Sequence, residues 1–321
     1  MLKRSLCAAL LSLACLFSVG CLSLGLLPTE MERVTVEESE RWLETSRVAL
    51  VDIEGFIGLD DSWLLGGTTV ADLKEKLNRA RQDWRVKAVV LRINSGGGAV
   101  SASDAMYEEV KQFNEETGKP VVACMMGTAA SGAYYTALGA DHIMASPTTV
   151  TGSVGVIMHF LNVQGLYNKL GLQSQVIKSG EKKDMGSPAR EMTEDEKRIL
   201  EGIMKSLFDR FLSIVKQERP DMTDEDISTI ADGRVVDAQD ALDFHMVDSI
   251  GHLDDAIAKA QELAGISDSD VVIYRAWPHY NANIYSKTSS QSGGPNLLAE
   301  GLKMFLRRRG PVFLYMWWPA M

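Results

Sequence analysis

The residues with the clearest chemical potential lie in one short run, C-M-M-G-T-A-A-S-G-A-Y-Y-T-A-L (124–138). An apolar stretch of strand length (121–126) ends at Gly127, and Ser131 then stands before a segment with helical composition. A serine at such a strand-to-helix turn has an exposed hydroxyl beside backbone N–H groups that have no partner within the helix. Such groups could hold the oxyanion of an acyl-transfer reaction. The simpler interpretation is that Ser131 only caps the helix.

A second glycine-rich stretch follows another strand pattern. Residues 86–93 (VKAVVLRI) predict a buried strand, N-S-G-G-G (94–98) predicts a turn, and a helix is expected from 101 to 116. Three consecutive glycines leave backbone amides unobstructed, which suits an oxyanion or an extended peptide. The G-x-G-x-x-G and G-K-[ST] orders of phosphate-binding loops are absent from this stretch.

A nucleophilic serine also needs a base, and lysine is one candidate. A neutral lysine can activate serine, but its ordinary pKa of about 10.4 must first be lowered, commonly by burial. Lys178, Lys182 and Lys183 lie together in a loop-like segment (178–190). The common role of a loop lysine is a solvated charge, since lysine is rarely buried.

Histidine is the other candidate base. The five histidines do not lie in a recognisable catalytic setting, but members of a triad need not be adjacent, so a histidine-based triad stays open. No two of them have a familiar metal-ligand spacing and no H-E-x-x-H occurs, so we expect no metal and no cofactor. The histidines are His142, His159, His245, His252 and His279.

The elements that must position these residues alternate along the chain. Strand and helix patterns follow one another from 48 to 264, which predicts one α/β domain with a largely parallel sheet. A capping box, T-E-D-E (193–196), begins a long amphipathic helix. Further strands are expected at 48–53, 121–126, 141–145 and 173–177, and further helices at 70–82, at 162–170 and three times within 223–264.

The N-terminus has the pattern of an export segment. A basic head precedes 23 uncharged residues, Ser5 to Leu27, and about 20 apolar residues suffice to cross a bilayer. The positive charges before this stretch predict that everything after it lies outside the cytoplasm. Residues 1–27 are therefore expected to be a signal peptide, cleaved before a lipidated Cys21, or an uncleaved membrane anchor. The acidic residues 28–46 would form a spacer.

The C-terminal extension (266–321) differs in composition from the domain before it. A polar linker (286–295) leads to three arginines (307–309) and to the apolar run VFLYMWW (312–318). Arginine beside tryptophan and tyrosine is typical of a membrane interface. Packing of this run on the domain or on a neighbouring subunit is an equal alternative.

Charge and cysteine content narrow the function classes. The net charge is −10 and the basic residues are scattered apart from the three arginines, so a nucleic-acid footprint is missing. The other three cysteines lie in the expected leader (1–27), so Cys124 is the only cysteine expected in the folded part. A single cysteine in the middle of a strand is expected to be a buried small hydrophobe and not a nucleophile.

Taken together, these motifs resemble the signal peptide peptidase A (SppA) family of membrane-bound serine proteases in its short, single-domain form. The resemblance runs in order over 85–260, and the remaining segments are expected to flank a peptidase domain at 47–265. The matching stretches are RINSGGG (92–98), GTAASGAYY (127–135), TGSVGVIM (151–158), IKSGEKKD (177–184), SPAREMT (187–193) and ADGRV (231–235).

The resemblance implies a ClpP/crotonase-like fold and a Ser/Lys dyad without cofactor or metal. The family nucleophile matches Ser131, the general base matches Lys183, and the serine that orients that base matches Ser153. The family oxyanion hole matches the backbone of Gly98, with help near Gly132. The family usually has proline at 96; glycine there would leave this turn looser but removes no catalytic group.

The resemblance also implies substrates, partners and location. The family degrades released signal peptides, which suggests extended apolar peptides as substrates, and it forms dome-shaped homo-oligomers whose serine and lysine come from neighbouring subunits. The protein would then be a membrane-anchored endopeptidase with its catalytic domain outside the cytoplasm. Two alternatives stay open: a catalytically inactive oligomeric scaffold on the membrane, and a crotonase-fold acyl-CoA enzyme, which would need acidic catalytic residues and no export signal.

Overall fold

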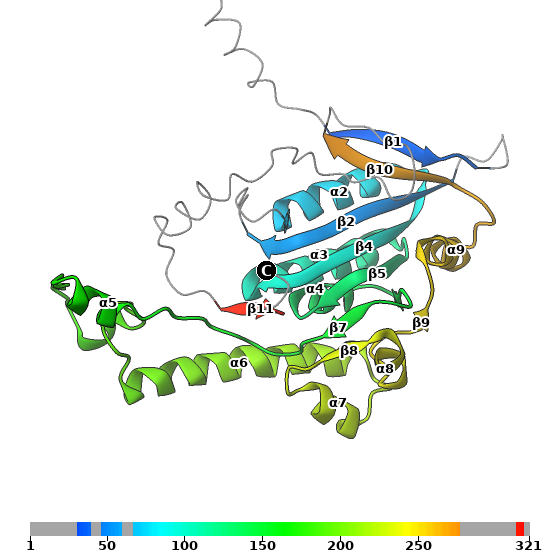
Figure 1. Ribbon diagram of the computed structural model, residues 1–321. Coiled ribbons are helices and arrows are strands. Elements are labelled where there is room, and N and C mark those ends of the chain that lie inside the picture. The colour runs from blue at the N-terminus through cyan, green and yellow to red at the C-terminus, as the bar shows by residue number, and fades with distance from the viewer. Residues whose placement is uncertain (1–30, 40–45, 60–66, 277–312, 318–321) are drawn as a thin grey trace, which may run out of the picture.

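A mixed β-sheet forms the centre of the computed structural model, which describes residues 31–39, 46–59, 67–276 and 313–317. The strand order is β1-β10-β2-β4-β5-β6-β9 (Figure 1). All neighbours from β10 to β9 are parallel, and β1 is antiparallel to β10. The predicted α/β class with a largely parallel sheet is confirmed. The strands are β1 (Met31–Glu37), β2 (Arg47–Gly58), β4 (Val86–Ala99), β5 (Val121–Ala130), β6 (His142–Ala145), β9 (Ser249–Ile250) and β10 (Asp270–Ala276).

Shorter strands and the helices surround this sheet. The additional strands are β3 (Gly67–Thr69), β7 (Val150–Gly152), β8 (Val235–Asp237) and β11 (Leu314–Met316). The helices are α2 (Val70–Gln82), α3 (Val100–Thr117), α4 (Gly132–Ala137), α5 (Gln164–Lys169), the short 3-10 helix η1 (Glu181–Asp184), α6 (Glu194–Glu218), α7 (Asp224–Ile230), α8 (Ala238–Asp243) and α9 (Leu253–Leu263).

Both faces of the sheet are covered, which explains the continuous apolar strand sequences. Alternate side chains of a strand point to opposite faces, so Leu91 belongs to one buried cluster and Val90 to the other. The first cluster includes Met106 of α3, and the second includes Ile257 of α9. A parallel sheet buried on both sides favours apolar runs over an apolar–polar alternation. This is the pattern that residues 86–93 and 121–126 show.

Local capping defines the ends of the main helices. The Thr69 side chain accepts a 3.1 Å hydrogen bond from the amide of Asp72 at the start of α2. At the start of α6, the amide of Glu196 donates to the Thr193 side chain, and the Glu196 carboxylate accepts from the Thr193 amide. The capping box predicted from the sequence is therefore present. Gly118 ends α3 with a left-handed backbone (φ 63°).

The predicted glycine turn at 94–98 is wrong, because β4 continues to Ala99. Gly97 and Gly98 pair with Phe56 and Ile57 of β2, so the glycines extend the strand. A Cβ on Gly98 would lie 2.1 Å from the carbonyl oxygen of Ile57. Glycine is needed here for close backbone approach, which local sequence cannot distinguish from a need for a turn.

The predicted strand at 173–177 is also wrong in this chain. These residues lie in the arm, the segment 155–193 between β7 and α6, which carries α5 and extends away from the sheet (Figure 1). No strand of the described part of the chain pairs with 173–177, and the Ile177 side chain is fully exposed. A segment without a neighbouring strand cannot form a β-ladder, whatever its propensity.

The segments at both ends of the expected domain contribute to the sheet. β1 lies within the expected spacer (28–46), and β10 and β11 lie within the expected C-terminal extension (266–321). The expected leader (1–27), the linker (286–295) and the three arginines (307–309) lie outside the described residues. None of the helices described combines the length and the apolar character that crossing a bilayer requires.

Candidate active site

Ser131 stands at a sharp junction between β5 and α4. Its backbone has φ 54° and ψ −116°, and positive φ is uncommon outside glycine. The Ser131 amide donates a 2.7 Å hydrogen bond to the Gly152 carbonyl, and its own carbonyl accepts one of 2.8 Å from Tyr135. Such strained positions persist only when the surrounding structure holds them, and they cluster at functional sites.

The Ser131 side chain is buried without a hydrogen-bond partner. It is 1 % exposed, and no described residue accepts from or donates to its Oγ. It therefore does not cap α4, and the simpler interpretation of Ser131 as a helix cap is wrong. Because buried hydroxyls are nearly always hydrogen-bonded, an unsatisfied one needs a functional explanation. Ser131 is therefore a candidate nucleophile.

The two expected oxyanion glycines face each other beside Ser131. A Cβ on Gly132 would lie 3.2 Å from the amide nitrogen of Gly98 and 2.2 Å from Oγ of Ser103. Gly97 has φ 100°, and a Cβ there would lie 2.7 Å from the amide nitrogen of Gly132. Only glycines permit this approach, so the backbone amides of β4 and of the start of α4 border one small space. Backbone amides in this arrangement can stabilise a developing negative charge on oxygen.

Ser153 joins the same site through the pairing of β5 and β7. Ala130 pairs with Gly152 in this parallel ladder, so Ser131 and Ser153 each follow one member of the pair. Ser153 also has a positive φ, 52°, and its amide donates a 2.6 Å hydrogen bond to the Arg234 carbonyl. The structure thus brings together four of the five expected site residues.

The fifth expected site residue, Lys183, is not brought to Ser131 within this chain. It is exposed on η1, inside the arm. The other two lysines of this loop are held in ion pairs, Lys178 with Asp184 at 2.7 Å and Lys182 with Asp195 at 2.5 Å. Across the described ranges, no carboxylate forms an ion pair with Lys183. Of the three lysines, Lys183 alone has no counter-ion among the described residues.

A charged cluster ties η1 of the arm to the start of α6. Arg190 contacts Asp184 at 2.7 Å and Glu196 at 2.6 Å. The hydrogen bond from the Arg190 guanidinium and, to a smaller extent, that from Lys178 hold the pKa of Asp184 well below its ordinary value. The same guanidinium lowers the pKa of Glu196 to about 2. These ion pairs tie η1 to the first turn of α6 and so set the position from which Lys183 projects.

An aromatic cluster close to Ser131 was not predicted from the sequence. The ring of Tyr315 stacks on Tyr135 with centroids 5.2 Å apart and lies 4.7 Å from the ring of Phe211. The Tyr315 hydroxyl donates a 2.6 Å hydrogen bond to the carbonyl of Leu207. The pair Y-Y at 134–135 was visible in the sequence, but its partners come from α6 and β11, far along the chain.

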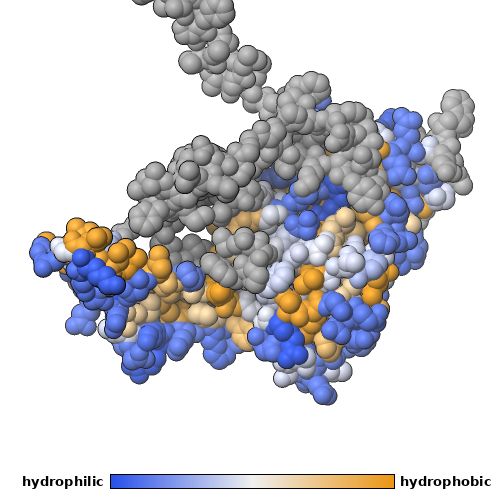
Figure 2. All heavy atoms as spheres, viewed as in Figure 1, coloured by the Kyte–Doolittle hydropathy of each residue, from blue (hydrophilic) through white to orange (hydrophobic). Residues whose placement is uncertain are grey.

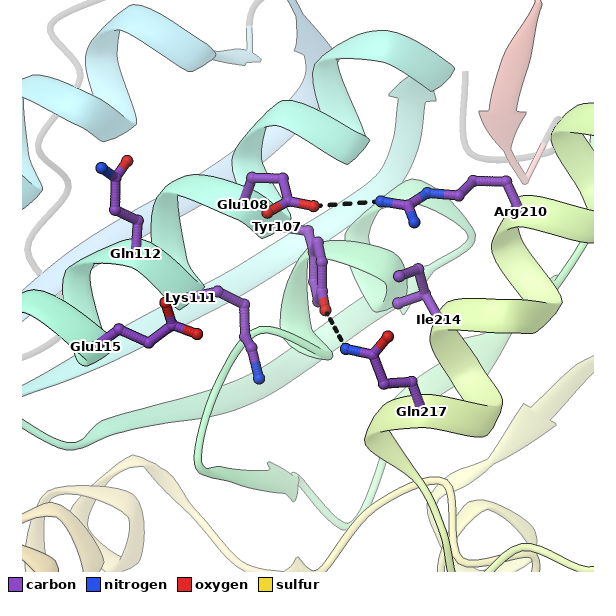
Figure 3. Close-up of a pocket in the computed structure, with 8 residues that line it drawn as sticks. All are labelled: Tyr107, Glu108, Lys111, Gln112, Glu115, Arg210, Ile214 and Gln217. Carbon is purple, nitrogen blue, oxygen red and sulfur yellow. Dashed lines mark hydrogen bonds and ion pairs between the residues drawn. The ribbon is translucent and has the colours of Figure 1, made fainter.

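A polar surface pocket between α3 and α6 lies on the other side of these rings. Its volume is about 370 Å³ (Figure 3). Tyr107, whose ring meets that of Tyr135 edge-on at 5.6 Å, forms one wall of the pocket. Figure 3 shows Glu108 directed at Arg210 and Tyr107 directed at Gln217. The lining is mostly charged and polar and carries no serine or cysteine.

Other candidate chemistry is not supported by the described residues. Cys124 is fully buried and burial raises the pKa of its thiol to about 12, as expected for a small hydrophobe. The ring of His142 contacts Ser249 at 2.8 Å, and no histidine of the described ranges contacts Oγ of Ser131. His279 lies outside the described residues. The described part of the chain contains no cluster of metal-binding side chains.

Comparison with known proteins matches two family models. The model of peptidase family S49 matches residues 113–267, and that of Clp protease matches residues 68–151. An Enterococcus faecium protein named for signal peptide peptidase SppA is 35 % identical over 200 residues, which cover 62 % of this chain and 58 % of that protein. Protease 4 of Salmonella typhi is 36 % identical over 214 residues, covering 67 % of this chain and 34 % of that protein.

A relative of similar length extends the match. A Synechocystis protein named as a protease is 35 % identical over 225 residues, which cover 70 % of this chain and 77 % of that protein. The fold is of the ClpP/crotonase-like type, in agreement with the Clp protease match and the largely parallel sheet. The chain belongs to peptidase family S49, the serine-protease family of signal peptide peptidase A and protease 4.

Proposed function

We propose that this protein is a serine endopeptidase that cleaves extended apolar peptides, signal peptides among them, with Ser131 as nucleophile and Lys183 as general base. The observation that carries the proposal is the buried, unsatisfied Oγ of Ser131 beside the facing glycines Gly98 and Gly132. Family membership supports peptide hydrolysis as the reaction.

The proposed reaction follows the general scheme of acyl transfer. The neutral amine of Lys183 takes the proton of Ser131 while Oγ attacks the substrate carbonyl carbon. The carbonyl oxygen becomes an oxyanion that the amides of Gly98 and Gly132 stabilise. The amine of the leaving peptide takes the proton as the C–N bond breaks, and water then hydrolyses the acyl-enzyme ester. Ser153 would position the lysine through its hydroxyl.

The exposed arm supports a site shared between subunits. Apolar side chains gather over α5 and the residues around it (Figure 2). Exposed apolar patches of this kind mark interaction sites. A second copy of the chain that covered the arm would also remove water from Lys183, which favours its neutral amine. The exposed apolar residues of the arm are Leu161, Leu166, Leu170, Leu172, Val176 and Ile177.

The sequence before the described residues supports membrane attachment. The uncharged stretch from Ser5 to Leu27 would anchor or export the chain, and the basic head before it would stay in the cytoplasm. The catalytic domain would then stand outside the cytoplasm, beside the peptides that the proposed activity removes.

Cleavage of a leader-like apolar peptide by the full chain tests this function. We expect Ser131→Ala and Lys183→Ala each to lose at least about 1000-fold in kcat/KM, as for other members of a catalytic dyad or triad. Lys182→Ala is the matched control, since Lys182 pairs with Asp195 on the surface and should remain active. Retained activity in Lys183→Ala would overturn the assignment of the base.

A mixing experiment tests the shared site. Ser131→Ala and Lys183→Ala, each inactive alone, are dissociated, mixed and reassembled. Mixed assemblies then contain interfaces with one intact serine and one intact lysine, so part of the activity should return. No recovery would count against a site shared between subunits. A wild-type protein that binds apolar peptides but cleaves none would instead support a scaffold.

A further inference from the structure

An exposed tryptophan lies among basic side chains at one end of the sheet. Trp84 belongs to the turn between α2 and β4, and it is 68 % exposed. The Arg85 guanidinium and the Lys87 amine lie 5.3 and 5.8 Å from the centroid of a Trp84 ring. These distances are typical of cation–π contacts. The indole therefore stands in solvent beside two cations and takes no part in the packing of the core.

The two cations beside Trp84 have no acidic partner among the described residues. The Lys87 amine donates a 3.1 Å hydrogen bond to the Trp84 carbonyl, which holds the amine close to the ring. By contrast, Arg79 in the last turn of α2 pairs with Glu75 at 2.9 Å. The tip of the turn thus carries two positive charges that no neighbouring carboxylate neutralises.

Three further basic side chains converge on the same turn. Arg33 and Arg47 contact the Asp83 carboxylate at 3.0 and 2.9 Å, and Lys119 donates a 3.0 Å hydrogen bond to the Asp83 carbonyl. Arg47 also lies 3.8 Å from Asp270. Within the described ranges these two carboxylates are the only ones paired with the five cations, so the surface is basic in a chain of net charge −10. We call it the Trp84 patch: Arg33, Arg47, Trp84, Arg85, Lys87 and Lys119.

The composition of the Trp84 patch fits the surface of an anionic membrane. Tryptophan favours the headgroup level of a bilayer, because its ring is apolar and its N–H is polar. Lysine and arginine are attracted by the negative potential of anionic lipids. An exposed indole between two unpaired cations, Arg85 and Lys87, combines both properties within four residues.

The chain also keeps the patch near a bilayer. Arg33 is six residues beyond Leu27, where the expected N-terminal anchor ends, and six residues span at most about 22 Å. The ion pair between Arg33 and Asp83 joins this part of the chain to the turn that carries Trp84. A surface tethered at such a short distance is present at a high effective concentration, which favours the membrane over a soluble acidic protein as the partner.

We propose that the Trp84 patch rests on an anionic membrane, with the Trp84 ring among the lipid headgroups. The inference rests on the membrane attachment of the proposed function and is independent of its chemistry. The patch lies at the N-terminal ends of β2 and β4, whereas Ser131 follows the C-terminal end of β5, at the other end of these parallel strands. Membrane contact through the patch therefore leaves the proposed catalytic junction unobstructed.

Quenching of tryptophan emission by brominated lipid tests the contact. The full chain is incorporated into vesicles of phosphatidylglycerol or of phosphatidylcholine, each with and without brominated acyl chains. The emission difference between the wild type and Trp84→Phe isolates Trp84 from the other tryptophans, and so exposed a residue can be replaced without loss of the fold. We expect brominated phosphatidylglycerol to quench at least about half of this difference and brominated phosphatidylcholine to quench much less, because the contact needs both the ring and the anionic surface.

Substitution of the two unpaired cations tests the role of charge. Arg85→Gln/Lys87→Gln should weaken the contact about 25-fold, since each cation near an anionic surface contributes about fivefold. The matched control is Arg198→Gln/Lys205→Gln, which removes two cations whose side chains are 74 % and 73 % exposed on α6. The control should keep the quenching of the wild type. Each emission difference is taken against Trp84→Phe in the same background.

The outcomes separate this inference from the proposed function. A chain that sediments with the vesicles while Trp84 stays unquenched would overturn the inference and leave membrane attachment standing. Equal quenching in the two lipids, or an equal loss in the two double variants, would overturn an anionic membrane as the partner. A chain that sediments with neither vesicle would overturn both the attachment and the inference. Quenching of Trp84 in a protein that cleaves no leader-like peptide would support the inference although the proposed chemistry fails.

Discussion

The amide of Ser131 donates its 2.7 Å hydrogen bond to the carbonyl of Gly152, which joins the end of β5 to the end of β7. Both strands leave the sheet immediately after this contact, and each does so through a serine with positive φ. Ser131 and Ser153 therefore share one backbone support, and a change in either strand end would move both hydroxyls.

Replacing Ser153 by glycine should separate stability from activity. A left-handed backbone costs a non-glycine residue about 1–2 kcal/mol, and glycine avoids this cost. Glycine also loses more chain entropy on folding, which lowers the free energy of unfolding by about 0.5–1 kcal/mol. We expect Ser153→Gly to be about 0.5 kcal/mol more stable in chemical denaturation and about 100-fold lower in kcat, the range for a lost positioning group.

His245→Gly provides the control for this prediction. His245 is the third non-glycine residue with positive φ (57°) in the described ranges, and it lies outside the proposed site. Its replacement should give a similar gain in stability with unchanged peptide cleavage. An equal loss of activity in both variants would contradict a specific role for Ser153.

Gly132→Ala should abolish peptide cleavage while Gly202→Ala does not. A Cβ on Gly132 meets Ser103 Oγ at 2.2 Å and the Gly98 amide at 3.2 Å, so it fills the space that the oxyanion needs. Gly202 lies inside α6 with open space around its Cβ position, and alanine there should add about 0.5–1 kcal/mol of stability. Kinetics and denaturant unfolding measured on both variants check this; an active Gly132→Ala protein would exclude these amides from the reaction.

Thiol reagents should leave Cys124 of the native protein unmodified and peptide cleavage unchanged. Burial raises the pKa of the Cys124 thiol to about 12, and the side chain is inaccessible, so very little reactive thiolate exists at pH 8. Mass spectrometry after iodoacetamide treatment should find Cys124 free in native protein and alkylated in denaturant. Rapid modification with loss of activity would point to a cysteine nucleophile.

Breaking the buried ion pair between Asp52 and Arg92 should lower the free energy of unfolding far more than breaking a surface pair. Both side chains are almost fully buried on neighbouring strands, 2.5 Å apart. Asp52→Ala leaves the arginine charge buried, which should cost about 3–5 kcal/mol. Asp209→Ala, which breaks an exposed pair with Lys205, should cost less than about 1 kcal/mol in the same denaturation assay. Similar losses in the two variants would contradict this assignment.

Acidification should loosen the attachment of η1 to the start of α6. The pKa of Glu196 is about 2 in the folded protein, below its ordinary value of 4.5, and its stabilising contribution is therefore complete above pH 4.5. It is lost as the pH falls from 4.5 towards 2. Glu196→Gln should flatten the pH dependence of unfolding in this window, whereas the exposed Glu201→Gln on the same helix should not. An unchanged pH profile in Glu196→Gln would rule out this linkage.

Much of the fold could be predicted because the local sequence patterns match the burial and the capping of the elements they form. The strands at 86–93 and 121–126 are apolar throughout since both faces of the sheet are covered, and the Thr193 capping box marks the start of α6. The position of Ser131 at a strand-to-helix junction was visible in the sequence. Its role as nucleophile came from the family resemblance and stays a prediction.

The missed features depend on contacts between residues distant in the chain. The glycines at 97 and 98 extend β4 only because β2 and β11 lie beside them. Residues 173–177 have strand composition but no adjacent strand in this chain. The aromatic cluster combines residues of α4, α6 and β11, and no periodicity within one segment predicts that these residues meet.

The groove that holds β11 binds main chain on both sides, and this has a consequence for selectivity. An occupant must offer free N–H and C=O groups to Gly96–Val100 and to Ile157 at once. A helix has already engaged those groups internally, and a strand inside a sheet has already engaged them with its neighbours. Under the proposed function, a substrate bound along the same edge of β4 would be selected by its conformation before any side chain is recognised, and natively folded proteins nearby would be spared.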